Sequence, residues 1–328
     1  MRHYFIDLHT HGIKQYDTRT DKPEDILNMA ELHGRAGTGA ILPTIYPGPI
    51  DEMRENMEAV KQAMQVQSSK FKVQSSNPPL PPFAKGGTGG INSSLVTRHS
   101  ALILGVHLEG PFLNPLRSGA LDKNSFIKPS ISSFKKIIDG YEDIIKIMTV
   151  APEMPGVLKI IGKCIEIGIR VNMGHSDATY KQAVEGKRAG ATGITHIFNA
   201  MRPFHHREPG IAGFGLLDEE VYIEVIADSV HIHPKALELI FSTKRLDRII
   251  LVSDSVKSNP PIPPLVKGGK GGFLGKKGIP IYTKEGILAG SSITISDSVE
   301  ILKDIGISEA EIIKTAVDNP KRYLSLEF

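Results

Sequence analysis

Residues 6–12 read IDLHTHG, and this short stretch near the start of the chain gives the first indication of both the fold and the site. Residues two apart in a β-strand share one face, so His9 and His11 are expected to point the same way. Two neutral imidazoles that converge at a strand end form half of a divalent-metal site. The alternative is that one histidine caps the strand by hydrogen bonding while the other is exposed.

Outward from this stretch, short β-rich apolar runs alternate with helix-like segments. Such alternation predicts a parallel sheet in an α/β fold, and eight repeats of it favour a closed (β/α)8 TIM barrel over an open doubly wound sheet. The predicted strands are Tyr4–Leu8, Ala40–Ile45, Ala101–Leu108, Ile144–Val150, Ile169–Met173, Gly193–Ile197, Val221–Ala227 and Arg248–Val252. The predicted helices include Pro23–Arg35, Asp51–Gln65, Ser132–Tyr141, Gly156–Ile167, Tyr180–Ala189 and Pro234–Thr243.

Histidines and carboxylates follow the ends of nearly all these strands. In a barrel of this kind the chemistry gathers at the C-terminal strand ends. Histidine is only 12 of 328 residues, so core histidines placed by chance would not follow the strand ends this closely. The pattern therefore favours a metal site. The residues at these ends are His9, His11, His107, Glu109, Glu153, His175, His196, Asp228, His231 and Asp254.

Length and composition restrict the class of protein. The 328 residues are enough for a single catalytic barrel spanning 1–328. A balance of 39 Lys and Arg against 36 Asp and Glu does not indicate a nucleic-acid partner. The single cysteine, Cys164, can form no disulfide within the chain, which fits a reducing cytoplasm. No apolar run approaches the roughly 18 residues of a membrane span, so we expect a cytoplasmic protein without a membrane partner.

Two segments interrupt the alternating pattern with nearly the same sequence. Residues 76–91 read SNPPLPPFAKGGTGGI, and residues 258–273 read SNPPIPPLVKGGKGGF. Prolines remove backbone donors and glycines loosen the chain, so neither copy is expected to form helix or sheet. We interpret both as flexible inserts in surface loops. The alternative is a proline-rich recognition motif.

Seven sequence blocks occur in an order that resembles the N-acetylglucosamine-6-phosphate deacetylases of the amidohydrolase superfamily. The resemblance runs from residue 6 to about residue 323, apart from the two inserts, and the combination of blocks is specific. The blocks are HLEGPFLN at 107–114, MGHS at 173–176, THIFNAM at 195–201, REPG at 207–210, DSVH at 228–231, SD at 253–254 and LAGSS at 288–292.

The resemblance implies a metal centre. It places one divalent ion at Glu109, His175 and His196, the ligands that the family shares. Family members with His-x-His on the first strand can hold a second ion, so His9 and His11 suggest a binuclear site, with one or two ions per subunit. Carboxylate and imidazole ligands together suit Zn, Fe, Mn or Co.

The resemblance also implies a reaction. Asp254 matches the family's general base and acid in hydrolysis of N-acetylglucosamine 6-phosphate to glucosamine 6-phosphate and acetate. The guanidinium of Arg207 has a shape that suits phosphate, and the alternative for this residue is an ion pair with Glu208 or another exposed carboxylate. The residues that match substrate contacts are Asn199, Ala200, Arg207, His231, Ala120, Leu121, Leu288, Ala289 and Gly290.

Three features depart from the family pattern. The family usually has a small β-sandwich built from residues before the first strand and after the last helix, and we expect both halves to be absent here. Leu121 occupies a position where members commonly have a substrate-binding histidine, and it cannot hydrogen bond. The second insert follows Asp254 closely, where a loop would cover the substrate, so we expect slower closure or a wetter pocket.

Two alternatives to this function remain open at this stage. One is a related enzyme that acts on N-acetylgalactosamine 6-phosphate or on another cyclic amide. The other is a catalytically impaired remnant that binds a ligand without turnover, which the inserts and trimmed ends suggest. Retention of the metal positions and of Asp254 favours an enzyme with an amino-sugar phosphate as its small-molecule partner. A homodimer is one assembly that the resemblance allows.

Overall fold

The computed structural model describes residues 4–75, 100–258, 281–284 and 286–327. The inserts expected at 76–91 and 258–273 therefore lie outside the described residues, apart from Ser258. Within the described ranges, no helix combines the length and the apolar character needed to span a membrane.

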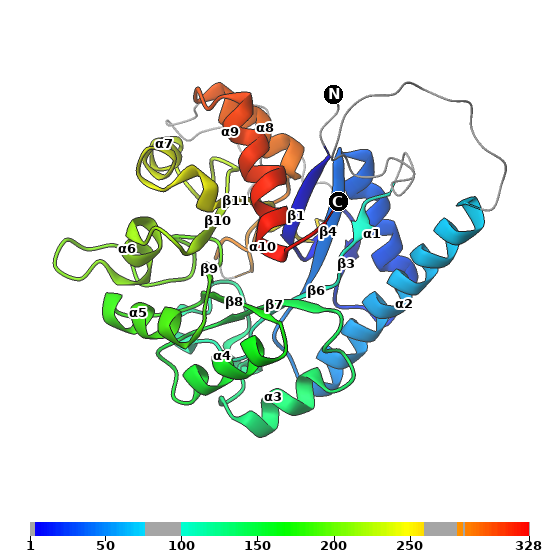
Figure 1. Cartoon of the computed structure of the whole chain (residues 1–328), viewed down its shortest axis with the longest axis horizontal. Coiled ribbons are helices and arrows are strands. Elements are labelled where there is room, and N and C mark those ends of the chain that lie inside the picture. Colours follow the sequence, from blue (N-terminus) through cyan, green and yellow to red (C-terminus); the bar gives the residue numbers. More distant parts are fainter. Residues whose placement is uncertain (1–3, 76–99, 259–280, 285, 328) are drawn as a thin grey trace.

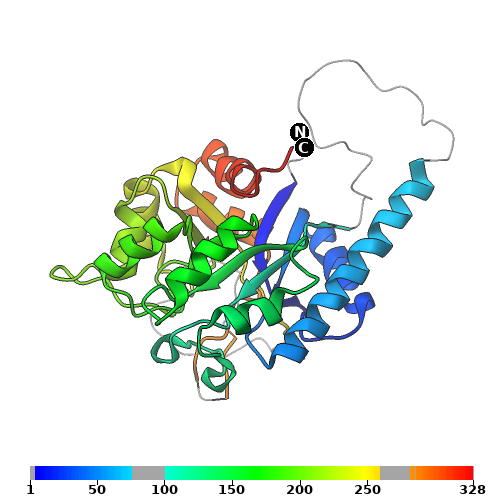
Figure 2. The ribbon, with the colours of Figure 1, turned by 60° about the horizontal axis from the view of Figure 1, so that its bottom comes forward.

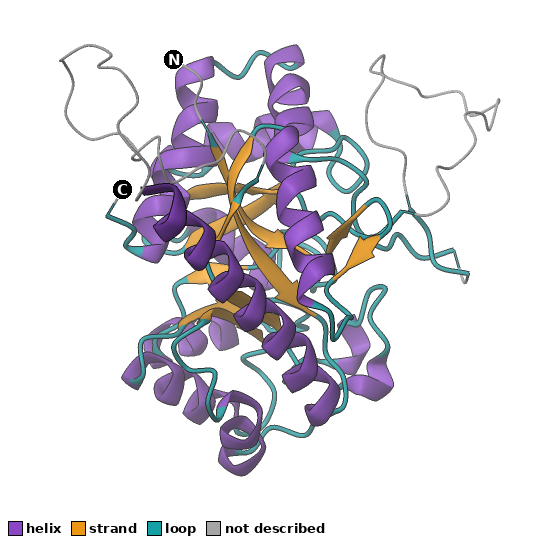
Figure 3. Cartoon of the chain, turned by 90° about the vertical axis from the view of Figure 1, so that its right-hand side faces the viewer, coloured by secondary structure: helices purple, strands orange, loops and turns teal. Residues whose placement is uncertain are grey.

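The strands curve into a barrel with helices packed around its outside (Figures 1 and 3). Their hydrogen-bonded order is β1-β4-β6-β7-β8-β9-β10-β11, and every adjacent pair along this path runs parallel. The predicted (β/α)8 architecture is thus confirmed. The bounds are β1 Phe5–Thr10, β4 Thr38–Ile45, β6 Val106–Glu109, β7 Ile145–Val150, β8 Arg170–Met173, β9 Gly193–Ile194, β10 Tyr222–Ile226 and β11 Ile249–Val252.

The first and last strands of this path meet beyond the C-terminal end of β11. The amide of Asp254 donates to the carbonyl of His9 at 2.9 Å, and Thr10 forms a parallel bridge with Ser255. The amide of His11 donates to the carbonyl of Ser255 at 2.8 Å. The seam between the two ends of the sheet therefore lies next to the IDLHTHG stretch.

The predicted strand Ala101–Leu108 is interrupted in the structure. It divides into β5 (Leu102–Ile103), which pairs with β4, and β6, which pairs with both β4 and β7. Gly105 lies between the two parts with φ of 141°, and a Cβ there would lie 2.3 Å from the carbonyl oxygen of Ile144. Only glycine fits this bend, which redirects the chain toward Glu109.

The helices follow the prediction closely in some places and depart from it in others. Three of them, α1, α5 and α7, have the predicted bounds, whereas α2 continues well beyond Gln65 and projects from the barrel at its C-terminal end (Figure 2). Helix α6 was not predicted, because GIAGFGLL is apolar all round and shows no helical period. The helices are α1 Pro23–Arg35, α2 Ile50–Ser75, α3 Ile131–Ile138, α4 Val157–Glu166, α5 Tyr180–Ala189, α6 Gly210–Leu217, α7 Pro234–Thr243, α8 Ile295–Asp304, α9 Glu309–Ile313 and α10 Asn319–Leu324.

Smaller elements complete the described chain. A short antiparallel hairpin of β2 (Gly12–Ile13) and β3 (Tyr16–Asp17) follows β1. Three 3-10 turns lie at Pro115–Arg117, Lys123–Ser125 and Leu246–Arg248, and a π-helical turn lies at Lys314–Asp318.

Two apolar clusters hold the barrel together. The larger one joins strand and helix side chains, and it contains Cys164, whose thiol pKa burial raises to about 12. This thiol is therefore a packing group. The smaller cluster collects strand residues such as Ile147 and Ile226 with Tyr323 of α10. Burial of this kind contributes about 25 cal/mol per Å² of apolar surface, and it gives the strand ends a rigid support.

Candidate active site

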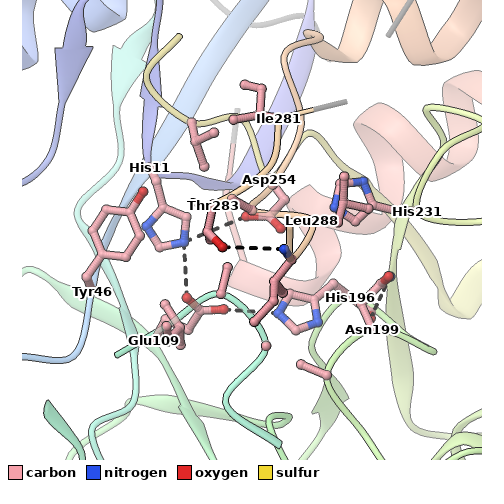
Figure 4. Close-up of a pocket in the computed structure, with 18 of the residues that line it drawn as sticks. His11, Tyr46, Glu109, His196, Asn199, His231, Asp254, Ile281, Thr283 and Leu288 are labelled. Carbon is pink, nitrogen blue, oxygen red and sulfur yellow. Dashed lines mark hydrogen bonds and ion pairs between the residues drawn. The ribbon is translucent and has the colours of Figure 1, made fainter. Parts of the chain in front are cut away.

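A cavity of about 410 Å³ opens at the C-terminal ends of the barrel strands (Figure 4). It brings together residues from the beginning, middle and end of the chain, as a barrel does. Most of the predicted site residues line it, namely His11, Glu109, Ala120, Leu121, His175, His196, Asn199, Ala200, His231, Asp254, Leu288, Ala289 and Gly290. His9 is fully buried beside this wall and is not part of the lining.

Glu109, His175 and His196 form the first group of potential metal ligands, which we call the Glu109 group. Glu109 ends β6, and the two histidines follow β8 and β9. The Oε1 atom of Glu109 lies 3.1 Å from Nε2 of His175 and 3.0 Å from Nε2 of His196. All three side chains are buried. Their ligand atoms thus converge on one small volume in a nearly dry environment.

Hydrogen bonding fixes how His175 can act. Its Nδ1 donates to the carbonyl of Arg117 at 2.9 Å, so in the neutral ring Nε2 carries a lone pair. That lone pair faces the Glu109 carboxylate, and two electron-rich groups at this distance attract each other only through a positive charge. Asp177 holds Arg117 in place through a 2.6 Å ion pair. The donor set of the Glu109 group therefore fits a divalent cation.

His9, His11 and Asp254 form the second group, which we call the His9 group. The two Nε2 atoms lie 3.2 Å apart, so the imidazoles converge as the strand alternation predicts. Asp254 brings its Oδ1 to 3.5 Å from Nε2 of His9 and 3.7 Å from Nε2 of His11. The Nδ1 of His11 donates to the carbonyl of Thr44 at 3.0 Å, so in the neutral ring Nε2 carries the lone pair, and it lies 3.1 Å from Oε2 of Glu109. This group also matches a cation site in its chemistry.

The pKa values of the histidines indicate that both groups favour a positive charge between their side chains. Burial disfavours the charged form of His196, but the hydrogen bond and negative charge of Glu109 outweigh it and raise the pKa to about 9. The pKa of His11 is raised for the same reasons. Burial lowers the pKa of His9 to about 4 in spite of the negative charges of Asp254 and Glu109, so this ring is neutral. The negative charge that favours protons on these buried imidazoles also favours a metal cation, which would replace the protons on binding.

Several site residues have an uncommon backbone conformation. The φ angles are 46° at His175, 27° at His196, 47° at Ala200 and 46° at Asp254, all in the left-handed region. Non-glycine residues there cost about 1–3 kcal/mol each and persist only where the surrounding structure imposes them. These turns direct the side chains across the mouth of the barrel, which an unstrained strand end would not do.

His231 contributes an oriented ring on another side of the cavity. Its Nδ1 lies 2.7 Å from Asp228 Oδ2, which also accepts from Ser291 Oγ at 3.1 Å. Burial raises the pKa of Asp228, but the His231 interactions outweigh this and lower it. The carboxylate therefore holds the Nδ1 proton of His231 and leaves Nε2 available to a ligand.

The remaining predicted contacts form the polar and apolar walls. Asn199 donates its side-chain amide to the carbonyls of His196 and Ile197, which leaves its Oδ1 available. Leu121 lines the cavity with an aliphatic side chain and offers no hydrogen bond there. The segment 288–290 also lines the cavity. The roles of these residues toward a substrate remain predictions.

Arg207 is the one predicted contact that the structure does not place at the cavity. It is exposed on the loop before α6, and it does not line the pocket. Within the described part of the chain no ion pair joins Arg207 to Glu208, whose carboxylate instead accepts from the amides of Tyr180 and Gly210. The residue type suited phosphate, but only the path of the loop decides where its side chain lies.

The structure adds residues that the sequence analysis did not identify. The guanidinium of Arg19 lies 4.2 Å from the centroid of the Tyr46 ring, and Tyr46 stacks on His11 with centroids 3.9 Å apart. Asp17 accepts two hydrogen bonds from the Arg19 side chain. Tyr46 immediately follows a predicted strand, so its position at a strand end was a usable signal. Nothing in the sequence around Arg19 indicated that it would reach the cavity.

The comparisons with known proteins agree with this geometry. The model of the amidohydrolase family matches residues 5–327. The chain belongs to the amidohydrolase family. This family generally depends on divalent metal ions, and its members hydrolyse C–N bonds.

Two curated relatives of this amidohydrolase are deacetylases of amino-sugar 6-phosphates. It is 30% identical to N-acetylgalactosamine-6-phosphate deacetylase of Escherichia coli O157:H7, over 98% of the chain and 78% of that protein. It is also 30% identical to N-acetylglucosamine-6-phosphate deacetylase of Lysinibacillus sphaericus, over 98% of the chain and 76% of that protein. Among solved structures, N-acetylglucosamine-6-phosphate deacetylase from Thermotoga maritima matches with a TM-score of 0.77 at 27% identity, over 98% of this chain and 78% of that one.

Proposed function

We propose that this amidohydrolase hydrolyses the acetamide of N-acetylglucosamine 6-phosphate to glucosamine 6-phosphate and acetate. The observation that carries the proposal is the position of Asp254, whose carboxylate lies beside His9 and His11 and lines the same cavity as Glu109, His175 and His196. Similarity to enzymes that deacetylate amino-sugar 6-phosphates supports this choice of substrate.

We assign the metal ligands from the two groups. Glu109, His175 and His196 would hold one divalent ion, and His9 with His11 would hold a second. When bound, such an ion polarises a carbonyl and lowers the pKa of water from 15.7 to about 7. Zn, Fe, Mn and Co all suit this mixture of carboxylate and imidazole.

Asp254 provides the proton transfers that amide hydrolysis needs. Its carboxylate is only partly exposed, at 13%, and it lies beside the convergent imidazoles. It would accept a proton from the attacking water and deliver one to the leaving nitrogen of the sugar. His231, oriented by Asp228, would donate from Nε2 when protonated and stabilise negative charge on the substrate.

The walls of the cavity suit an anionic sugar. Arg19 and Lys257 both line it and bring positive charge to a site whose deeper part is rich in carboxylates. Asn199, Ala200 and the segment 288–290 offer polar groups for sugar hydroxyls, while Ala120 and Leu121 provide an apolar surface. A phosphorylated amino sugar has both kinds of surface.

Acetate release from N-acetylglucosamine 6-phosphate by the metal-reconstituted protein tests the proposal. Elemental analysis of the same sample gives the metal content, and Asp254→Asn serves as the inactive control. Turnover in the wild type and its loss in the variant would support the proposal. No acetate from any N-acetylhexosamine phosphate, although metal is bound, would overturn it in favour of a ligand-binding remnant.

A second substrate is favoured by one observation. The relative that acts on the galactosamine isomer matches this chain as well as the glucosamine enzymes do. Leu121 also replaces the histidine expected at a substrate contact, so specificity for the sugar hydroxyls is open to change. The ratio of kcat/KM for the two 6-phosphates decides between them.

A further inference from the structure

Glu224 is a buried carboxylate that the proposed reaction does not use. It belongs to β10, where it is the one charged side chain in the apolar run VYIEVIA at 221–227. Its exposure is 1%, and no Lys or Arg of the described residues forms an ion pair with it. A carboxylate in such surroundings is costly unless it has hydrogen-bond donors and a compensating charge nearby.

The first donor to Glu224 is His9. The Nδ1 of His9 lies 3.2 Å from Glu224 Oε2, and a carboxylate can only accept hydrogen bonds. The proton of the neutral ring is therefore held on Nδ1. The lone pair is left on Nε2, which faces His11 at 3.2 Å and Asp254 at 3.5 Å. Glu224 thus selects the tautomer of His9 that can bind a cation at the cavity.

The second donor holds the carboxylate itself in place. Asn172 of β8 donates its side-chain amide to Glu224 Oε1 at 2.7 Å. The hydroxyl of Tyr323 in α10 donates in turn to the side-chain oxygen Oδ1 of Asn172. Asn172 and Tyr323 are almost fully buried. A continuous chain of hydrogen bonds thus runs from the C-terminal helix through the barrel interior to the imidazole of His9.

Glu224 is better explained as a support than as a ligand of its own metal site. It lies with His9 and His107 in a group compact enough to hold an ion. However, both ring nitrogens of His107 have partners, the Leu8 carbonyl at 3.0 Å and Thr149 Oγ1 at 2.8 Å. A third ion would have to break these bonds in the buried barrel interior.

We propose that Glu224 is a positioning residue. It fixes the tautomer of His9 whose Nε2 lone pair can bind a metal ion, and it thereby sets the affinity of the His9 group for that ion. The inference rests on the second ion of the proposed function. Three carboxylates, Glu109, Asp254 and Glu224, surround His9 or its neighbours, and a second divalent cation offsets this negative charge. Removal of a carboxylate behind a metal-bound histidine typically weakens metal affinity 10–100-fold.

The test compares Glu224→Gln with Glu153→Gln in the full chain. Glu153 provides the same change of charge close to the cavity, because it bonds Asn114, Ser176 and Asp177 but none of the five ligand residues. Metal-free protein is titrated with Mn²⁺, and free ion is followed by electron paramagnetic resonance, which also detects coupling between two bound ions. Glu224→Gln is expected to weaken the second binding event about 10–100-fold and to leave the first unchanged. Glu153→Gln is expected to bind both ions like the wild type.

Thermal unfolding of the metal-free variants checks that the barrel is intact. If Glu224→Gln does not fold, Asn172→Ala keeps the carboxylate but removes its anchor, and a smaller loss of affinity for the second ion is then expected. If the tested variant binds both ions as tightly as the wild type does, the role of Glu224 is overturned, while the second ion itself stands. Uptake of a single ion by the wild type would instead overturn the second ion, and this inference with it, while deacetylation at the Glu109 group would stand.

Discussion

The Glu109 group and the His9 group bring their ligand atoms together in different ways. The Glu109 group takes its members from three strand ends, and both of its histidines lie in left-handed backbone turns. The His9 group takes His9 from β1 and His11 from directly after it, and only Asp254 comes from elsewhere. The first group therefore depends on three separate loops, whereas the second depends on strand alternation and on the seam that closes the barrel.

The two groups also differ in how their imidazoles are held. In the His9 group both Nδ1 atoms have acceptors, Glu224 for His9 and the Thr44 carbonyl for His11. In the Glu109 group, His175 is held by a carbonyl, but the buried Nδ1 of His196 has no partner among the described residues. Both imidazoles of the His9 group are therefore fixed from behind through Nδ1, whereas only one imidazole of the Glu109 group is. The predictions below test whether this difference affects how each group holds an ion.

Removal of all metal should have the largest effect, because both groups lose the charge that their electron-rich atoms require. Dialysis against a chelator is expected to abolish acetate release and to lower Tm, since the folded state alone binds the ions tightly. Addition of Mn²⁺, Co²⁺ or Zn²⁺ should restore both properties. Full activity in protein shown by elemental analysis to be metal-free would contradict the assignment of both groups.

Asp254→Asn should separate catalysis from metal binding. The amide keeps the shape of the side chain but cannot carry a proton between water and the leaving nitrogen, so kcat is expected to fall about 10²–10⁴-fold. The ion of the Glu109 group should be retained, because Asp254 is not a member of that group. Steady-state kinetics and metal analysis of the same preparation check this, and loss of all bound metal would show that Asp254 has a different role.

His9→Ala and His11→Ala should sharpen the comparison between the groups. Each variant is expected to lose one of two ions while keeping the ion of the Glu109 group and the barrel fold. Metal stoichiometry and circular dichroism provide the measurements, and Glu109→Gln is the matched variant in the other group. If His9→Ala and His11→Ala both retain the wild-type metal content, the His9 group is not a metal site.

Leu121→His should give the smallest effect, because it changes a residue in the wall of the cavity and leaves the Glu109 group and the His9 group intact. A new side-chain hydrogen bond to the substrate contributes about 0.5–1.5 kcal/mol, so KM is expected to fall roughly 2–10-fold with kcat little changed. Kinetics with the glucosamine and galactosamine 6-phosphates measure it. An unchanged KM for both sugars would place the substrate away from Leu121.

Much of the fold was predictable because the barrel repeats a local pattern. Apolar strands and amphipathic helices alternate, and helices such as α5 begin with a capping box that the sequence displays. Helix α6 was not predictable in this way, since an apolar glycine-rich segment has no periodic face. The break at Gly105 depends on the carbonyl of Ile144, a contact between two strands that no local pattern encodes.

The site was predictable in its chemistry and less so in its geometry. His9 and His11 could be paired from the two-residue strand period, and Glu109, His175, His196 and Asp254 from their strand ends and the family resemblance. Glu224 was overlooked, although one carboxylate within an apolar strand was visible evidence of a buried role. Arg207 was expected at the cavity from its residue type, and the exposed loop places it elsewhere.

The sequence by itself determined which side chains share a strand face and which lie at strand ends, because strand geometry and the direction of parallel strands follow from local rules. Only the tertiary structure decided which Nε2 atoms meet, which Nδ1 atoms are held, and that His175, His196 and Asp254 turn inward on left-handed backbone. These features depend on contacts between residues up to 246 positions apart, such as Ser253 with Asp7, which form only when the barrel closes.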